Sequence, residues 1–199
     1  MNLNPASSGS TTKRILVACI GNIFLGDDGF GVEVAKRLQS RTPRPYPPSV
    51  EVVDFGIRGM DLAYALLDED YDALVLVDAV PRGGPPGTLY LIEPDLEGLS
   101  PEKGAQAGTV ALDTHSMDPV KVLAFALGLG ARPIHTLVVG CEPTAILGGE
   151  DDIEMQMELS EPVQNAVDEA VKMIDSLIEQ LLSNGVTPAA GASSKTNDV

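Results

Sequence analysis

One stretch near the N-terminus constrains the fold of this chain more than any other: residues 15–31, ILVACIGNIFLGDDGFG. Its opening apolar run, residues 15–20, has the length and the Ile and Val content typical of a strand buried on both faces. A glycine-rich loop with two adjacent aspartates follows, and apolar residues then recur at helical spacing over residues 30–39. The stretch therefore predicts a strand, an acidic loop and a helix.

The acidic loop does not have the pattern of a nucleotide site. Backbone amides at a helix N-terminus suit phosphate, but the glycines here are spaced in the wrong order for G-x-G-x-x-G, and no Gly-Lys-Ser/Thr follows. Asp27 and Asp28 would also place two negative charges where a pyrophosphate would sit. Paired carboxylates at the end of a strand instead suit a cation or proton transfer. Either aspartate by itself is equally well interpreted as the N-cap of the following helix.

The rest of the chain continues to alternate strands with helices. Further apolar strands are predicted at residues 50–54, 73–80 and 134–139, and a short alternating strand at residues 88–92 suits an antiparallel edge. Helices are predicted from about residue 60, from Pro119 and from Ser160, the last as an N-cap. This order predicts α/β class: a single-domain three-layer αβα sandwich with a mainly parallel twisted sheet and one antiparallel edge strand. The domain spans residues 13–185, between tails at 1–12 and 186–199 whose composition predicts disorder.

Composition narrows the partners and the compartment. The 199 residues carry a formal net charge of -16, which disfavours nucleic acid and anionic membranes and favours a protein, peptide or cationic partner. Cys19 and Cys141 lie in apolar runs without CxxC spacing, so we expect reduced core residues. No apolar segment reaches the roughly 18 residues of a membrane span, and residues 1–14 lack a signal core. We therefore expect a cytoplasmic protein, and a monomer because no helix has a spare apolar face.

Several chemistry-bearing residues lie at or just after the carboxyl ends of the predicted strands. The carboxyl ends of parallel strands open at one edge of a sheet, so Asp27 and Asp28, Asp54 and Asp78 are expected to converge there. His115 immediately precedes the helix that begins at Pro119. We expect Asp28, Asp78 and His115 to meet. Two carboxylates and one imidazole leave positions open for water or substrate, and imidazole suits nickel, zinc or iron.

Other candidates are less specific. His135 begins an apolar strand and is interpreted as a packed or edge histidine. Glu142 follows a strand end, where it would either support a ligand or be an exposed loop carboxylate. Asp54 would either orient a ligand or cap the turn after its strand. No Ser, Cys or Thr has the setting of a covalent nucleophile.

Five separated blocks together resemble the hydrogenase maturation protease family. They are Gly21-Asn22-x-x-x-x-Asp27-Asp28-Gly29-x-Gly31, Asp54-x-Gly56-x-x-Gly59-Met60, Val77-Asp78-Ala79, His115, and Gly140-x-Glu142-Pro143 with Leu159-Ser160. The resemblance covers nearly all of residues 13–184, in order and with matching spacing.

The resemblance implies an endopeptidase that removes a C-terminal extension from the large-subunit precursor of a nickel-iron hydrogenase after nickel insertion. The family's nickel-contacting residues map onto Asp28, Asp78 and His115, with Asp27 as a reserve candidate. Such an incomplete set would engage nickel already held by the substrate's own cysteines, and so gate cleavage. Water would then be the nucleophile, with the metal polarising the scissile region.

Two alternatives belong to other classes. A magnesium-binding signalling receiver domain also has an acidic pair after its first strand, but it needs a Lys at the end of its last strand. Residues 139–143 read VGCEP, without a Lys. A non-proteolytic nickel chaperone for hydrogenase assembly would use the same ligands. Sequence does not separate it from a protease, although the whole-chain resemblance favours the protease.

Overall fold

The structure is a computed structural model that describes residues 12–95, 119–144 and 158–183. The two predicted tails lie outside these residues except for Thr12, and so does His115.

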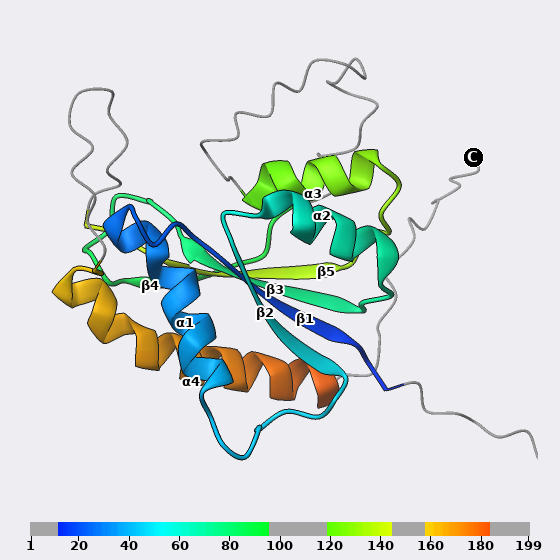
Figure 1. Cartoon of the computed structure of the whole chain (residues 1–199), viewed down its shortest axis with the longest axis horizontal. Helices are drawn as coiled ribbons and strands as arrows, with labels where there is room; N and C mark the ends of the chain where they lie inside the picture. The colour runs from blue at the N-terminus through cyan, green and yellow to red at the C-terminus, as the bar shows by residue number, and fades with distance from the viewer. Residues whose placement is uncertain (1–11, 96–118, 145–157, 184–199) are drawn as a thin grey trace, which may run out of the picture.

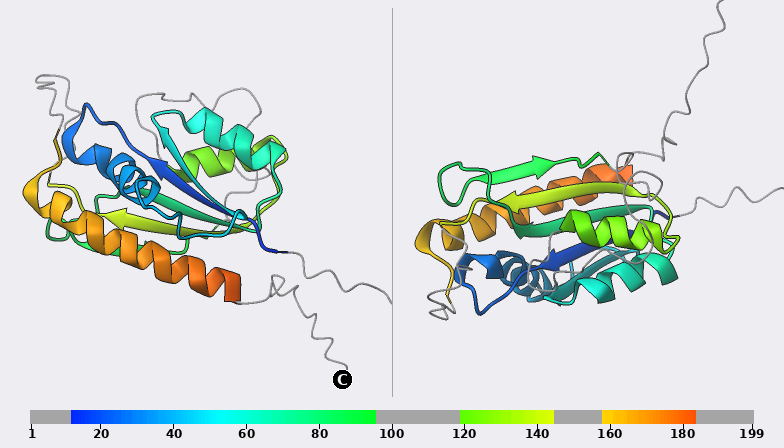
Figure 2. Two further views of the ribbon diagram at one scale, coloured as in Figure 1. Left: turned by 60° about the horizontal axis from the view of Figure 1, so that its bottom comes forward. Right: turned by 90° about the horizontal axis from the view of Figure 1, so that it is seen from above.

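In the described part of the chain, five strands form a single sheet in the order β2-β1-β3-β5-β4. Their bounds are β1 Ile15–Ile20, β2 Val50–Gly56, β3 Ala73–Ala79, β4 Leu89–Ile92 and β5 His135–Cys141. Neighbouring strands from β2 to β5 are parallel, whereas β4 pairs antiparallel with β5 at the edge, where Leu89 lies opposite Cys141. The right panel of Figure 2 shows β4 running in the direction opposite to its neighbour β5. The predicted mainly parallel sheet with one antiparallel edge strand is confirmed.

Helices cover both faces of this sheet. They are η1 Gly26–Gly29, a short 3-10 helix, followed by α1 Phe30–Gln39, α2 Gly59–Asp68, α3 Pro119–Gly128 and α4 Glu161–Ser183. Figure 1 shows α1 and α4 on one side of the sheet and α2 and α3 on the other. The bounds predicted for α1 are those observed, and Pro119 begins α3 as expected. The three-layer sandwich is therefore confirmed.

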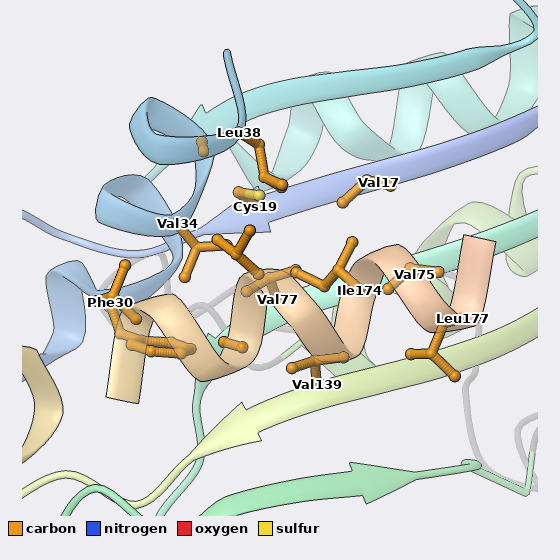
Figure 3. Packing of buried hydrophobic residues seen from close by; sticks show 14 of the residues in the cluster. Val17, Cys19, Phe30, Val34, Leu38, Val75, Val77, Val139, Ile174 and Leu177 are labelled. Carbon is orange, nitrogen blue, oxygen red and sulfur yellow. The ribbon is translucent and has the colours of Figure 1, made fainter. Parts of the chain in front are cut away.

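The two faces of the central strands explain their continuous apolar run. Val17 and Cys19 of β1 join the core with α1 and α4, whereas Leu16 and Ala18 pack with α2 and α3. Every residue of β1 and β3 is buried, because a parallel sheet covered on both faces leaves no side chain for solvent. Figure 3 shows the first core, in which Ile174 of α4 packs toward the side chains of the sheet.

The two cysteines belong to this core, as predicted. Both are free and fully buried. Burial raises the pKa of the Cys19 thiol well above its usual range, and burial, with the charges of Asp27 and Glu142 adding to it, raises that of Cys141 to about 12. Neither thiol is therefore an available nucleophile.

A glycine sets the contact between α1 and the sheet. A Cβ placed on Gly31 would lie 2.0 Å from the carbonyl oxygen of Ile20 and 2.5 Å from that of Val77. The first turn of α1 therefore rests directly on the backbone of β1 and β3, an approach that no other residue type permits. This contact places η1, and with it the two aspartates, at the carboxyl edge of the sheet.

Candidate active site

Asn22 organises the loop between β1 and η1. Its N–H donates to the carbonyl oxygen of Asp28 and to Asp28 Oδ2, both at 3.1 Å. Its carbonyl oxygen accepts the N–H of Leu25 at 3.1 Å, and its side-chain oxygen accepts the N–H of Phe24 at 3.0 Å. One residue of the Gly21-Asn22 motif thus folds the loop back on itself and fixes one oxygen of the Asp28 carboxylate.

Asp28 is only partly buried. Desolvation by burial raises the pKa of its carboxyl group, although the Asn22 N–H partly offsets this by favouring the charged form. Within the described residues, no hydrogen-bond donor is found for Asp28 Oδ1. A half-buried carboxylate with one oxygen fixed by a backbone N–H suits a metal ligand.

Asp78 lies near the end of β3, the strand beside β1. The register pairs Cys19 with Val77, so Asp78 comes immediately after that pair. Its side chain is 6% exposed, and its Oδ1 accepts the N–H of Ala79 at 2.8 Å. Leu76 packs with α2 and α3, and residues two apart in a strand lie on the same face of the sheet, so Asp78 lies on the face covered by these two helices. The structure therefore brings Asp28 and Asp78 to the carboxyl ends of two neighbouring strands.

The third predicted ligand, His115, lies outside the described residues, and the described chain resumes at Pro119. Among the residues that the structure does describe, no three His, Cys, Asp or Glu side chains are grouped so that they could hold a metal ion. The set of Asp28, Asp78 and His115 therefore stays a prediction.

Asp27 has a different environment from its neighbour. Its side chain is 4% exposed, and its Oδ1 accepts the N–H of Ser160 at 2.7 Å. Its Oδ2 accepts the N–H of Thr144 at 2.7 Å and the hydroxyl of Ser160 at 2.9 Å. Neither η1 nor α1 has a side-chain cap, so the prediction that Asp27 or Asp28 caps the following helix is wrong. Asp27 instead binds the residue that precedes a distant helix, α4.

Ser160 is the N-cap position of α4, as predicted, because its carbonyl oxygen accepts the N–H of Gln164 at 2.8 Å. Its hydroxyl does not serve that helix. It donates to Asp27 and lies 2.8 Å from Thr144 Oγ1. The sequence identified where α4 starts, but not that its first residues are held by the acidic loop.

Glu142 holds the loop that follows Asp78. It is 4% exposed, so its interpretation as an exposed loop carboxylate is wrong. It accepts the N–H groups of Arg82 and Gly83, at 2.8 and 2.9 Å, and the Tyr90 hydroxyl at 2.7 Å. Burial acts to raise the pKa of Glu142, but these hydrogen bonds outweigh it and hold the pKa below its usual range. Tyr90 was missed at the sequence level, where an alternating edge strand gives no sign of a polar contact.

Asp54 and His135 are the remaining candidates on the strands. Asp54 lies opposite Cys19 on β2, and it does not cap α2, which has no side-chain cap. That interpretation of Asp54 is wrong. His135 is exposed at the start of β5, five positions before the residue that pairs with Asp78, and its Nε2 lies 3.2 Å from Glu93 Oε1. His135 is thus not packed in the core, and it lies on an interior strand of the sheet.

Comparisons with known proteins agree on one family. Residues 32–177 match the hydrogenase maturation protease family. A putative hydrogenase maturation protease of Methanocaldococcus jannaschii is 34% identical over 81% of this chain and 94% of its own length. The hydrogenase expression/formation protein HoxM of Azotobacter vinelandii is 31% identical over 90% of this chain and 78% of its own.

The fold is shared with solved structures of the same kind. The hydrogenase maturating endopeptidase HybD of E. coli superposes with a TM-score of 0.63 and 25% identity, covering 84% of this chain and 93% of that protein. Of the described helices, none has the length and apolar character needed to cross a membrane.

Proposed function

This chain belongs to the hydrogenase maturation protease family and is a peptidase, and we propose that it removes the C-terminal extension of a nickel-iron hydrogenase large-subunit precursor after nickel has been inserted. The observation that carries this proposal is the placement of Asp28 and Asp78 at the carboxyl ends of adjacent strands, each held by a backbone N–H. Family membership indicates the class of reaction. The two carboxylates would provide metal-binding groups at the edge of the sheet where parallel α/β folds form their sites.

In this proposal, Asp28, Asp78 and His115 bind nickel that arrives in the substrate. Two carboxylates and one imidazole are too few donors to saturate the ion, so by themselves they bind Ni²⁺ only weakly. They hold it firmly only while the precursor's own cysteines also bind it. A precursor without nickel then lacks the feature that the enzyme recognises, so it is not cleaved until nickel has been inserted. Asn22 and the Ala79 N–H hold the two carboxylates in place, which limits the entropy lost on binding.

The attacking group in this proposal is water. Both cysteines are buried, with thiol pKa values raised above the usual range, and this excludes them as nucleophiles at neutral pH. The substrate's nickel would position and polarise the scissile region, as metal ions do in other hydrolyses. Two free buried thiols also suit a reducing compartment, so we place the reaction in the cytoplasm. We further propose that the enzyme acts as a monomer.

The test is a processing assay on a large-subunit precursor from the same source, with and without inserted nickel, followed by subunit mass. We expect loss of a C-terminal peptide only from the nickel-loaded precursor. Binding without any change in mass, on a precursor that another maturation protease cleaves, would instead identify a non-proteolytic nickel chaperone.

A pair of histidine variants tests the site itself. His115→Ala is expected to abolish processing without unfolding the protein, as judged by circular dichroism. His135→Ala is the matched control, because this exposed histidine lies at the far end of β5 from Asp78. Processing at the wild-type rate by His115→Ala would remove His115 from the proposed ligand set.

A further inference from the structure

The two adjacent aspartates of η1 have separate environments. In a 3-10 helix, three residues complete a turn, so successive side chains leave the axis about 120° apart. Asp28 is only half-buried and meets Asn22, whereas Asp27 is 4% exposed and meets Thr144 and Ser160. A side chain so enclosed, with donors at both of its oxygens, has little room for a metal ion.

The contacts of Asp27 join three distant parts of the chain. Thr144 and Ser160 lie 117 and 133 positions away in the sequence, one just after β5 and the other at the start of α4. Figure 1 shows the start of α4 at the same side of the molecule as the beginning of α1. Hydrogen bonds that carry a charge on one partner are about twice as strong as neutral ones. The N-terminus of a helix also favours a nearby negative charge.

The close approach of Gly31 to β1 and β3 holds the end of η1 that leads into α1 against the sheet. The Asp27 carboxylate adds a second attachment, to the segments after β5 and before α4. The loop before η1 is joined to β2 by the Gly21 N–H, which donates to the Gly56 carbonyl oxygen, and is otherwise bonded to itself through Asn22 and Leu25. Neither η1 nor α1 has a side-chain cap. The Asp27 carboxylate is therefore what joins the loop and η1 to Thr144, after β5, and to Ser160, before α4.

We propose that Asp27 is the positioning residue of the active site: by binding Thr144 and Ser160 it holds η1 so that the neighbouring Asp28 carboxylate faces the metal. This inference rests on the proposed function, because it takes Asp28 as a nickel-binding residue. It assigns the acidic pair two roles, one ligand and one anchor, and removes Asp27 as an alternative ligand.

The experiment measures the affinity of the purified full-length protein for Ni²⁺ alone by isothermal titration calorimetry. Asp27→Asn keeps the shape of the side chain but presents an NH₂ group to at least one of its N–H donors. We expect Ni²⁺ binding about 10–100-fold weaker than in the wild type, the usual effect of losing a residue that supports a metal ligand. Ser160→Ala removes only the hydroxyl donor and should give a smaller loss in the same direction.

Ile174→Val separates positioning from general stability. Ile174 is fully buried in the core between α4 and the sheet, and the substitution lowers stability without touching η1. It should leave Ni²⁺ affinity unchanged. Amide hydrogen exchange gives a second readout: Asp27→Asn should speed exchange at Asn22 and Asp28, and Ile174→Val should not.

Wild-type Ni²⁺ affinity in Asp27→Asn would overturn the inference, and so would a wild-type protein that binds no Ni²⁺. An equal loss of affinity in Ile174→Val would also overturn it, by showing that any destabilisation suffices. Failure of the proposed function has a different signature: wild-type protein that binds Ni²⁺ but leaves the nickel-loaded precursor uncleaved.

Discussion

Replacement of Gly31 by alanine is the sharpest test of how the fold positions the site. The new Cβ would lie 2.0 Å from the Ile20 carbonyl oxygen, 2.5 Å from that of Val77 and 2.8 Å from the Ile20 nitrogen. Ordinary contacts of a Cβ begin near 3.4 Å. Because all three atoms belong to the backbone of the two central strands, a change of side-chain rotamer gives no relief, and the start of α1 has to move away from the sheet.

The expected cost follows from these contacts. Overpacking in a core costs about 1–3 kcal/mol, and a clash with sheet backbone belongs at the upper end. Alanine recovers at most about 1 kcal/mol through its better helix propensity. We therefore expect Gly31→Ala to lower the free energy of unfolding by about 2–3 kcal/mol, or the melting temperature by roughly 5–10 °C for a domain of this size.

Urea denaturation at equilibrium measures this loss, with the m-value checked for constancy. Gly128→Ala is the matched control: it also lies in a helix, and its new Cβ would meet nothing within 4 Å. That variant should be as stable as the wild type or slightly more stable. A Gly31→Ala midpoint equal to that of the wild type would refute the close approach of α1 to the sheet and the reasoning that places η1 by it.

Two further predictions concern the site and the buried thiols. Burial raises the Asp28 pKa above the usual 3.8, so the folded state binds this proton more tightly than the unfolded state, and folding stability falls as pH rises through the raised value. Asp28→Asn should thus have a higher melting temperature than the wild type at pH 7, and it should lose Ni²⁺ binding. The difference in melting temperature should disappear below about pH 3.8, where the wild-type carboxyl group is protonated in both states. A difference that persists in acid would show that burial of the Asp28 charge is not its cause. Cys19 and Cys141, fully buried, should not react with a thiol reagent at pH 8 until urea unfolds the protein, and rapid labelling in the folded state would disprove their burial.

Much of the fold was predictable because its signals are local. Apolar runs bounded by glycine and proline located the strands, and the period of apolar residues gave α1 its observed bounds. The antiparallel edge strand was predictable as well, because a short alternating segment between two turns suits an exposed edge better than a buried position. Helix ends were located where the residues carry the signal themselves, as at Pro119 and Ser160.

The partners of buried polar groups were not predictable, because they come from distant parts of the chain. Glu142 follows a strand end as an exposed carboxylate would, yet Tyr90 and two backbone N–H groups of the loop after β3 enclose it. No spacing in the sequence records that contact, which arises only when β4 pairs with β5.

Asp27 and Asp28 illustrate both cases: one feature of the pair was predictable from the sequence, and another was not. The sequence by itself predicted that two carboxylates follow the first strand, that a third lies at the carboxyl end of a later strand, and that such ends open at one edge of a parallel sheet. Which of the pair is buried was decided only by tertiary structure. Asp27 is turned inward because the N–H groups of Thr144 and Ser160 arrive there once β5 and α4 have packed, and a buried carboxylate requires such donors.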